Sequence, residues 1–242
     1  MSIILVGGGP DTVTTPVVFD RFVKDVRRRA GGSRPPRIAV VLFDREGSSE
    51  YFLPAYLEPL RSRIPCDVAP TLLRTGEPAD PAAFDDVDGI VVGGGPTPEY
   101  LAGLLGSAAA IRAAAAAGVP YLGFSAGAMI APQRALVGGY RIRGTEVCSV
   151  ECSEGLDELD VRDGLGLVPF AVDVHAAQAG TLSRAVGAVA EGLVDRAVAV
   201  DENTALLLRH AELEDLEVIG TGHCWTIRAS GRKATVAVLS AD

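Results

Sequence analysis

The sequence has few of the residues on which disulfide-stabilised and metal-binding proteins depend. It contains 4 cysteines and 3 histidines among 242 residues. The cysteines, at positions 66, 148, 152 and 224, are too widely spread for a disulfide framework. No histidine has metal-motif spacing to Cys148 and Cys152, and two ligands do not complete a zinc site. We therefore expect neither a disulfide scaffold nor a metal centre.

Basic charge and long hydrophobic runs are also scarce. Lys and Arg number 22 against 31 Asp and Glu, which gives a net charge of −9. Because nucleic acids and anionic lipids are bound through positive charge, we expect neither as a partner. No run of ~18 apolar residues passes without glycine or charge, which argues against a membrane-spanning helix. The first nine residues lack the basic start and apolar stretch of a signal peptide, so we expect a cytoplasmic protein.

Apolar residues are plentiful, at 48%, and they alternate between two patterns. Short β-branched runs predict buried strands, and longer segments with helical period predict helices between them. We expect a single α/β domain over residues 1–242, with a mostly parallel sheet, helices on both faces in three layers, and a strand-rich C-terminal part. The predicted strands are 3–6, 38–42, 68–73, 89–92, 121–124, 168–174, 218–227 and 234–239, with 197–201 paired to 205–208. The predicted helices are 11–30, 50–63, 100–105, 107–117 and 182–190, and 147–163 is expected to be an acidic loop.

The segment Gly123-Phe124-Ser125-Ala126-Gly127 has the pattern of a nucleophile elbow. Such a turn needs small residues two before and two after the serine, because the chain passes so sharply from strand to helix. We expect Ser125 to be the nucleophile and the N–H of Ala126, at the start of the helix, to stabilise an oxyanion. The alternative is a tight strand-to-helix turn whose serine is incidental.

A second oxyanion donor is expected from the turn Gly93-Gly94-Gly95, which follows the strand 89–92. Its glycines free the backbone to direct the N–H of Gly94 or Gly95 into the site, and Thr97 adds a hydroxyl. The alternative is that the turn serves only close packing. The turn 7–9 lacks the spacing of a dinucleotide fingerprint, and we interpret it as structural.

The best candidate for the base is His175, at the end of the apolar run 168–174. A strand there would deliver it to the same sheet edge as Ser125. His210 lies in a charged stretch and is expected to be solvated. His223 alternates with apolar residues and is expected to pack in the core or at its rim.

Two carboxylates could orient the imidazole, Glu202 and Asp173. Asp173 and His175 share a strand face, so Asp173 could instead shape the pocket. The order serine, histidine, acid argues against the α/β-hydrolase fold, whose acid lies between the other two.

Four motifs, in order along the chain, resemble the serine peptidases of the dipeptidase E and cyanophycinase family, and more closely its cyanophycinase branch. They are Gly93-Gly94-Gly95 with Thr97; Gly123-Phe124-Ser125-Ala126-Gly127-Ala128; Gly164-Leu165-Gly166-Leu167-Val168-Pro169 leading to Asp173-Val174-His175; and Asp201-Glu202-Asn203-Thr204-Ala205.

This resemblance implies a class I glutamine amidotransferase-like fold. It also implies hydrolysis of small peptides or isopeptides near an aspartyl residue, through an acyl-enzyme and without metal or cofactor. Ser125, His175 and Glu202 would be the triad, and Thr97, Asp173 and Arg184 would contact substrate. The family includes monomers and dimers, so a homodimer is possible.

The sequence departs from the cyanophycinase branch at its substrate-binding positions. Of three arginines that follow the histidine in that branch, only Arg184 is present, and Val174 replaces a glutamine. Arg141 and Arg143 could substitute, although surface arginines on a strand are the simpler interpretation. These losses leave open a ligand-binding pseudoenzyme on the same fold. Glutamine amidotransfer is disfavoured, because no cysteine occupies the elbow.

Overall fold

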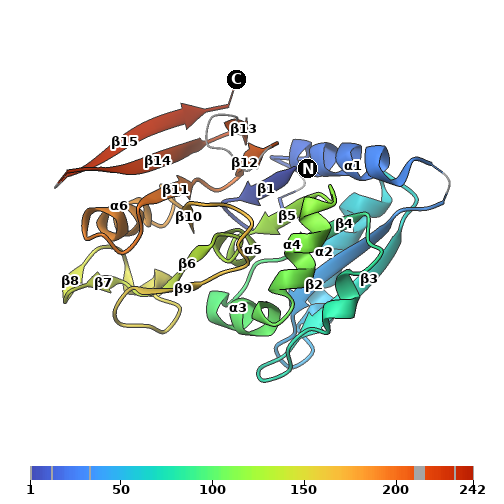
Figure 1. Ribbon diagram of the computed structural model, residues 1–242, viewed down its shortest axis with the longest axis horizontal. Coiled ribbons are helices and arrows are strands. Elements are labelled where there is room, and N and C mark those ends of the chain that lie inside the picture. Colours follow the sequence, from blue (N-terminus) through green and yellow to red (C-terminus); the bar gives the residue numbers. More distant parts are fainter. Residues whose placement is uncertain (1, 12, 33, 210–215, 232, 242) are drawn as a thin grey trace.

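A seven-stranded sheet forms the centre of the computed structural model, which describes residues 2–11, 13–32, 34–209, 216–231 and 233–241 (Figure 1). Its strand order is β13-β12-β1-β5-β4-β2-β3, and the bounds are β1 Ile3–Val6, β2 Arg37–Phe43, β3 Asp67–Leu73, β4 Gly89–Val92, β5 Tyr121–Phe124, β12 Thr204–Leu208 and β13 Leu216–Gly220. Strands β1 to β5 run parallel, and β12 and β13 add an antiparallel edge. The mostly parallel sheet expected from the sequence is confirmed.

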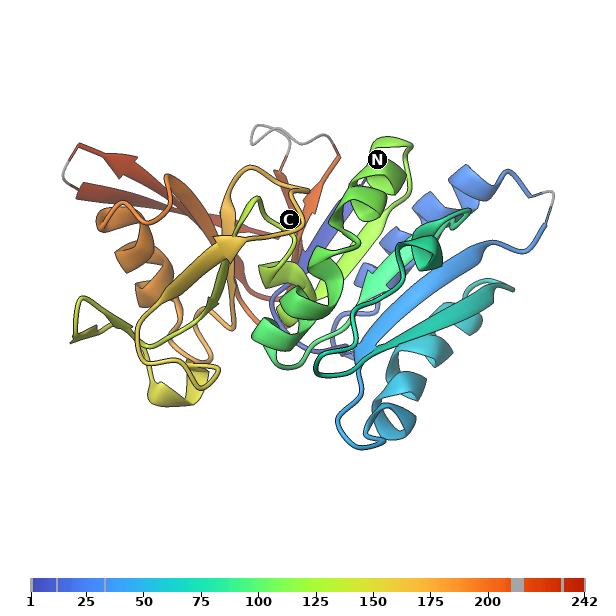
Figure 2. The same cartoon turned by 60° about the horizontal axis from the view of Figure 1, so that its bottom comes forward.

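Helices cover both faces of this sheet, as Figure 2 shows. Helices α1 (Val17–Ala30) and α2 (Ser49–Arg61) pack on one face, and α3 (Thr97–Leu105) and α4 (Ala108–Ala116) pack on the other. Successive residues of a strand point to opposite faces, so Ile4 contributes to one apolar cluster and Ile3 to the other. Because both faces are buried, the central strands β1, β4 and β5 are fully buried and apolar, and the three-layer prediction is confirmed.

The first helix starts later than its sequence pattern indicates. The Asp11 carboxylate accepts the N–H groups of Val13 and Thr14, which closes a turn ahead of α1. Pro16 then occupies the N-cap, and the helix ends at Gly31, whose φ of 63° is left-handed, as predicted.

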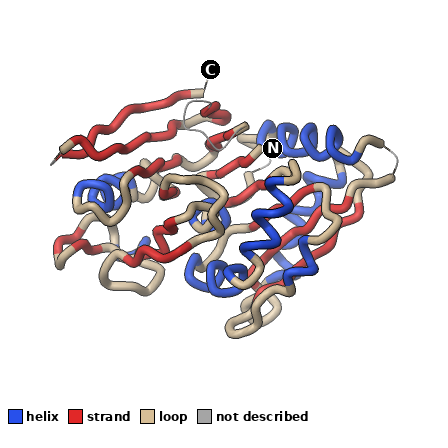
Figure 3. Tube along the Cα trace, viewed as in Figure 1, coloured by secondary structure: helices blue, strands red, loops and turns tan. Residues whose placement is uncertain are grey.

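A second sheet lies beside the first and contains β10 (Ala171–Val174), β11 (Arg196–Val200), β14 (His223–Ser230) and β15 (Lys233–Ser240) in that order. Helix α6 (Leu182–Ala190) packs on it. The strand-rich C-terminal part is evident in Figure 3. Apolar side chains of both sheets belong to one continuous cluster. The expectation of a single domain stays a prediction.

The predicted pairing of 197–201 with 205–208 is wrong. Strand β11 belongs to the second sheet and β12 to the main sheet, so the chain crosses between sheets at residues 201–203. It crosses back between β13 and β14, which divides the predicted strand 218–227 in two. Both segments are apolar because they are buried, and burial alone does not show which sheet a strand joins.

Smaller elements complete the fold. They are the short helix α5 (Ala126–Met129) and the 3₁₀ turns η1 (Pro81–Phe84) and η2 (Val150–Cys152). Two antiparallel strand pairs accompany them, β6 (Arg134–Gly138) with β9 (Asp160–Asp163) and β7 (Arg141–Ile142) with β8 (Thr145–Glu146). The expected loop 147–163 therefore includes a 3₁₀ turn and a strand. Among the described residues, no helix combines the length and apolar character needed to cross a bilayer.

Asp201 fixes the first crossing. Its buried carboxylate accepts the backbone N–H groups of Ala177 and His223 and the indole N–H of Trp225. These three donors come from the loop after β10 and from β14, so a single carboxylate connects them to the end of β11.

Replacement of Asp201 by alanine would leave these donors without an acceptor in the interior. We expect Asp201→Ala to lower the free energy of unfolding by about 3 kcal/mol, the cost of unsatisfied buried polar groups. Urea denaturation measures this change. Asp163→Ala, which removes an exposed carboxylate paired with Arg134 at the surface, is the matched control and should change stability by less than about 0.5 kcal/mol. Equal effects of the two variants would contradict the role given to Asp201.

Candidate active site

Ser125 stands at the turn between β5 and α5 in a backbone conformation that is rare for a residue with a side chain. Its φ is 47° and its ψ is −106°, which is strained for any residue other than glycine. The Ser125 N–H donates to the carbonyl of Val6, at the end of β1. The serine is thereby held at the carboxyl edge of the main sheet.

The two flanking glycines are required by close approach of the backbone. A Cβ atom at Gly123 would lie 2.5 Å from the Gly127 carbonyl oxygen, and one at Gly127 would lie 2.5 Å from that of Val92. Both distances are shorter than real contacts, so the structure explains the small residues that the elbow pattern requires. The helix that follows is only one turn long, so its contribution to an oxyanion is the free N–H of Ala126 and not a long helix dipole.

Ser125, His175 and Glu202 converge on one site. The Ser125 Oγ lies 3.0 Å from His175 Nε2, and His175 Nδ1 lies 2.7 Å from Glu202 Oε1. The imidazole and the carboxylate are partly exposed, at 30% and 43%. Of the two carboxylates proposed from the sequence, Glu202 contacts the imidazole and Asp173 does not.

His175 reaches the serine from a different sheet than expected. It follows β10 of the second sheet, and its N–H donates to the Gly7 carbonyl at the end of β1. Glu202 lies at the crossing between the sheets, and its N–H donates to the side chain of Gln178. No pattern in the sequence singled out Gln178. The arrangement of Ser125, His175 and Glu202 thus depends on the junction of the two sheets.

The turn 7–9 supports this junction, in line with the structural interpretation from the sequence. A Cβ atom at Gly7 would lie 2.1 Å from the Asp201 carbonyl oxygen, and one at Gly8 would lie 3.4 Å from the Glu202 Cγ. Glycine at position 7 therefore allows β1 to approach the crossing closely enough to accept the His175 N–H.

The turn Gly93-Gly94-Gly95 lies against Ser125, and of the two alternative donors expected from it, Gly94 or Gly95, the structure favours Gly95. The Gly94 N–H donates to the phenol oxygen of Tyr56 at 3.0 Å and is not free. The Gly95 N–H and the Ala126 N–H have no acceptor within the described part of the chain. Gly95 has a φ of 151°, which favours glycine. Two of the three predicted donors thus remain.

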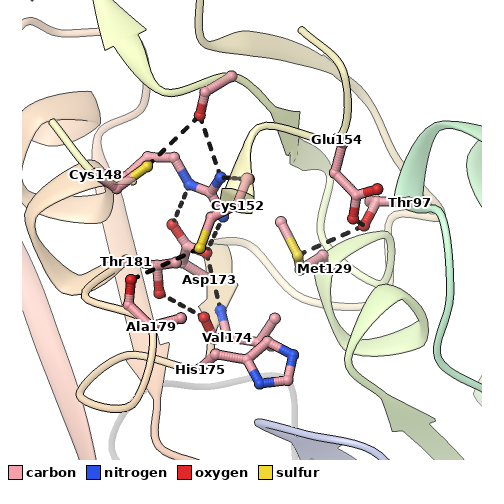
Figure 4. Close-up of polar contacts among 12 residues, drawn as sticks. Thr97, Met129, Cys148, Cys152, Glu154, Asp173, Val174, His175, Ala179 and Thr181 are labelled. Atoms are coloured by element: carbon pink, nitrogen blue, oxygen red, sulfur yellow. Dashed lines mark hydrogen bonds and ion pairs between the residues drawn. The ribbon is translucent and has the colours of Figure 1, made fainter. Parts of the chain in front are cut away.

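Asp173 and Arg184 form a buried ion pair, which favours a structural role for both, and their predicted contact with substrate stays a prediction. Arg184 Nε and Nη2 donate to the two carboxylate oxygens of Asp173 at 2.8 and 2.6 Å, and Nη1 donates to the carbonyls of Gly139 and Cys152 (Figure 4). Burial alone would lower the pKa of Arg184, but the pairing with Asp173 outweighs it and raises that pKa. The Asp173 side chain is fully buried and that of Arg184 nearly so.

Thr97 is also buried, and its hydroxyl is already occupied. Its Oγ1 donates to Glu154 Oε1 at 2.9 Å and lies 3.7 Å from the sulfur of Met129. The predicted contact of Thr97 with substrate stays a prediction. The exposed group beside it is Glu154, which no pattern in the sequence singled out because it lies in the segment interpreted as a loop.

A cavity of about 320 Å³ opens beside His175. Met129, Cys152 and Glu154 line it, and Figure 4 shows these side chains around one space with the imidazole. Glu151 adds a second carboxylate to the lining. Because the lining arginine, Arg184, is neutralised by Asp173, the uncompensated charge at this cavity is negative.

The remaining candidates lie away from the triad. His223 is about half exposed, with Nδ1 at 3.4 Å from Asp201, so of the two predicted positions, core or rim, it occupies the rim. His210 lies outside the described residues. Arg141 pairs with Glu146 and Asp157, and Arg143 with Glu191, all at the surface.

Burial raises the pKa of all four thiols, those of Cys66, Cys148, Cys152 and Cys224. A thiol with a raised pKa is largely protonated at neutral pH and is a poor nucleophile. This chemistry leaves the hydroxyl of Ser125, in contact with an imidazole, as the better-placed nucleophile.

If Arg184 is structural, its removal should affect folding far more than substrate binding. We expect Arg184→Met to lower the free energy of unfolding by about 3–5 kcal/mol, because Asp173 would remain buried without its partner. Urea denaturation tests this. The control Arg162→Met removes a surface arginine paired with Asp160 and should have little effect. A stable Arg184→Met protein with a strongly raised KM would contradict the structural role.

Comparisons with known proteins give the fold and the family. A peptidase from an acI-B1 Actinobacterium superposes with a TM-score of 0.72 at 18% sequence identity, over 99% of this chain and 94% of that one. A putative peptidase E protein from Listeria monocytogenes EGD-e superposes with a TM-score of 0.53, also at 18% identity, over 95% and 98%. At this identity the likeness shows a shared fold, and the mixed seven-stranded sheet covered by helices is the α/β architecture expected from the sequence.

No curated protein matches the chain. The model of peptidase family S51 matches residues 66–216, which is more than half of the sequence and includes Ser125, His175 and Glu202. The chain therefore belongs to peptidase family S51.

Proposed function

We propose that the protein is a serine peptidase that hydrolyses small peptides or isopeptides through an acyl-enzyme. The observation that carries this proposal is the unbroken contact chain from Ser125 Oγ through the His175 imidazole to the Glu202 carboxylate. Each link lies at hydrogen-bonding distance, which is the arrangement that nucleophilic catalysis by serine requires.

The mechanism follows from these contacts. Glu202 accepts the Nδ1 proton of His175, which leaves the lone pair of Nε2 facing the serine hydroxyl. As Ser125 Oγ attacks the substrate carbonyl, its proton passes to Nε2, and the imidazolium is stabilised by Glu202. The carbonyl oxygen becomes an oxyanion within reach of the free N–H groups of Gly95 and Ala126.

Collapse of this intermediate breaks the C–N bond, and the Nε2 proton passes to the leaving amine. Water then enters and gives one proton to Nε2 while its oxygen attacks the ester carbonyl. The second tetrahedral intermediate releases the carboxylic acid and returns the proton to Ser125 Oγ, which restores the enzyme. No atom in this cycle has to come from a metal or a cofactor.

The alternative of a ligand-binding pseudoenzyme on this fold is less well supported. Backbone strain such as that at Ser125 costs about 1–3 kcal/mol. A protein that only bound a ligand would gain nothing from that strain or from an imidazole paired on both sides. The missing family arginines bear on which substrate is bound and leave the reacting groups intact.

The motifs and the charges around the site limit the class of substrate that we propose. The sequence motifs favour the cyanophycinase branch and a bond next to an aspartyl residue. In this chain Arg184 is paired with Asp173, and the cavity beside His175 carries the carboxylates of Glu151 and Glu154. A free carboxylate inside this cavity would meet like charge. We therefore propose that an aspartyl side chain, if present, lies outside it, and that the cavity favours neutral or cationic groups.

A fluorophosphonate probe tests the nucleophile. We expect the probe to label the wild-type protein at Ser125, because the adduct forms on an activated serine hydroxyl. Ser125→Ala should abolish labelling and hydrolysis while circular dichroism shows an unchanged fold. Glu202→Gln should slow labelling about 10²- to 10⁴-fold, since the imidazole loses the partner that fixes its tautomer. Well-folded wild-type protein that the probe never labels would reject the proposal.

A library of dipeptides and isopeptides tests the substrate, with Ser125→Ala as the blank. We expect Glu154→Gln to lower kcat/KM about 5- to 10-fold for substrates with a cationic group and by less than twofold for neutral ones, as removal of one partly exposed charge predicts. Asp157→Asn removes a nearby carboxylate that pairs with Arg141 at the surface, outside the cavity lining, and serves as the control. A loss shared equally by all substrates would contradict a charge-selective role for Glu154.

A further inference from the structure

Two buried tyrosines hold the turn that faces the nucleophile. Tyr56 belongs to α2 and Tyr100 to α3, and these helices cover opposite faces of the main sheet. Both phenol oxygens reach the end of β4, where they lie 3.0 and 3.1 Å from the position that a Cβ atom at Gly93 would occupy. The exposed fractions of the two residues are 4% and 0%.

The two phenols bind opposite sides of one glycine. The Gly94 N–H donates to Tyr56 Oη at 3.0 Å, and the Tyr100 hydroxyl donates to the Gly94 carbonyl at 3.1 Å. The Tyr100 oxygen also accepts the N–H of Phe43 at 3.0 Å, so its own proton is left for Gly94. Burial raises the pKa of both phenols, which keeps them protonated.

The carbonyl of Gly94 and the N–H of Gly95 belong to the same peptide plane. In a trans peptide these two groups point in opposite directions. A hydrogen bond that draws the carbonyl inward to Tyr100 therefore turns the Gly95 N–H outward. Gly94 itself lies against the nucleophile, since a Cβ atom there would be 3.2 Å from the Ser125 Cβ and 3.9 Å from its Oγ.

We propose that Tyr100 and Tyr56 are positioning residues for the second oxyanion donor. Tyr100 orients the peptide that carries the Gly95 N–H, and Tyr56 fixes the preceding peptide by accepting the Gly94 N–H. This inference rests on the proposed serine mechanism and extends it, because it assigns the geometry of the donor to two helices that do not touch the reacting atoms.

The glycine-rich composition of the turn explains why positioning residues are needed. Three consecutive glycines have access to more backbone conformations than any other tripeptide, and rotation of the Gly94–Gly95 peptide would turn the donor away from the site. The adjoining Gly93 N–H donates to the carbonyl of Val41 in the sheet, but the peptide of Gly95 has no strand partner among the described residues. The phenol of Tyr100 supplies the missing constraint.

Phenylalanine substitutions test the inference, because they remove only the hydroxyls. The rings would keep their aromatic contacts, that of Tyr56 with Phe124 and that of Tyr100 with Phe43. We expect Tyr100→Phe to lower kcat about 10- to 100-fold with KM changed by less than about twofold, since an oxyanion donor acts on the transition state. The rate of fluorophosphonate labelling should fall in parallel, and Tyr56→Phe should show a smaller loss of the same kind.

Ser107→Ala is the matched control. It also removes a fully buried hydroxyl that donates to a backbone carbonyl, that of Ala79 at 2.9 Å, but at the start of α4, away from the glycine turn. We expect a similar loss of stability by urea denaturation and an unchanged kcat. Such a result separates the positioning of the donor from a general loss of stability.

Three outcomes would overturn the inference. Unchanged kcat in both tyrosine variants would do so, as would a loss matched by Ser107→Ala or a loss confined to KM. In each case labelling of wild-type Ser125 would leave the serine mechanism standing. Failure of the probe to label the wild-type protein would reject the mechanism and the inference together.

Discussion

The crossing of the chain between its two sheets is the constraint on which the site depends. The main sheet carries Ser125, the second sheet delivers His175, and Glu202 lies on the connection between them. Distances of 3.0 and 2.7 Å between these groups require the ends of β1, β5, β10 and β11 to meet within a few ångströms. The buried carboxylate of Asp201 and the absence of a side chain at Gly7 make that meeting possible, since one gathers backbone donors and the other permits close approach.

Charged groups in the interior are paired with one another, and the charged groups that remain accessible beside His175 are a different set. Groups that the sequence suggested for substrate binding, Asp173 and Arg184, are used inside the fold, where they satisfy one another and the carbonyls around them. What remains accessible beside His175 is acidic. The charge of the cavity beside His175 is therefore decided by which ions are paired within the protein, and it cannot be obtained from the number of charged residues near Ser125 and His175 in the sequence.

Much of the fold was predictable because burial on both faces leaves a strong local signal. Strands β1, β4 and β5 were located correctly from continuous apolar runs, and α6 from its helical period. The start of α1 was misplaced because Asp11 has the residue type of a helix N-cap, whereas its carboxylate closes a separate turn ahead of the helix. Sheet membership of β11 and β12 was also misjudged, since both are apolar and adjacent in sequence, and only long-range pairing distinguishes their partners.

The sequence by itself determined that a serine stands in an elbow, that glycines flank it and form a second turn, and that a histidine and acids follow buried strands. These features depend on steric rules within a few residues. Only the tertiary structure decided that Glu202 contacts the imidazole in preference to Asp173. It also decided that Gly94 gives its N–H to Tyr56, while that of Gly95 has no acceptor among the described residues. The physical reason is that a hydrogen bond has a direction, and that direction is set here by side chains on helices remote in sequence.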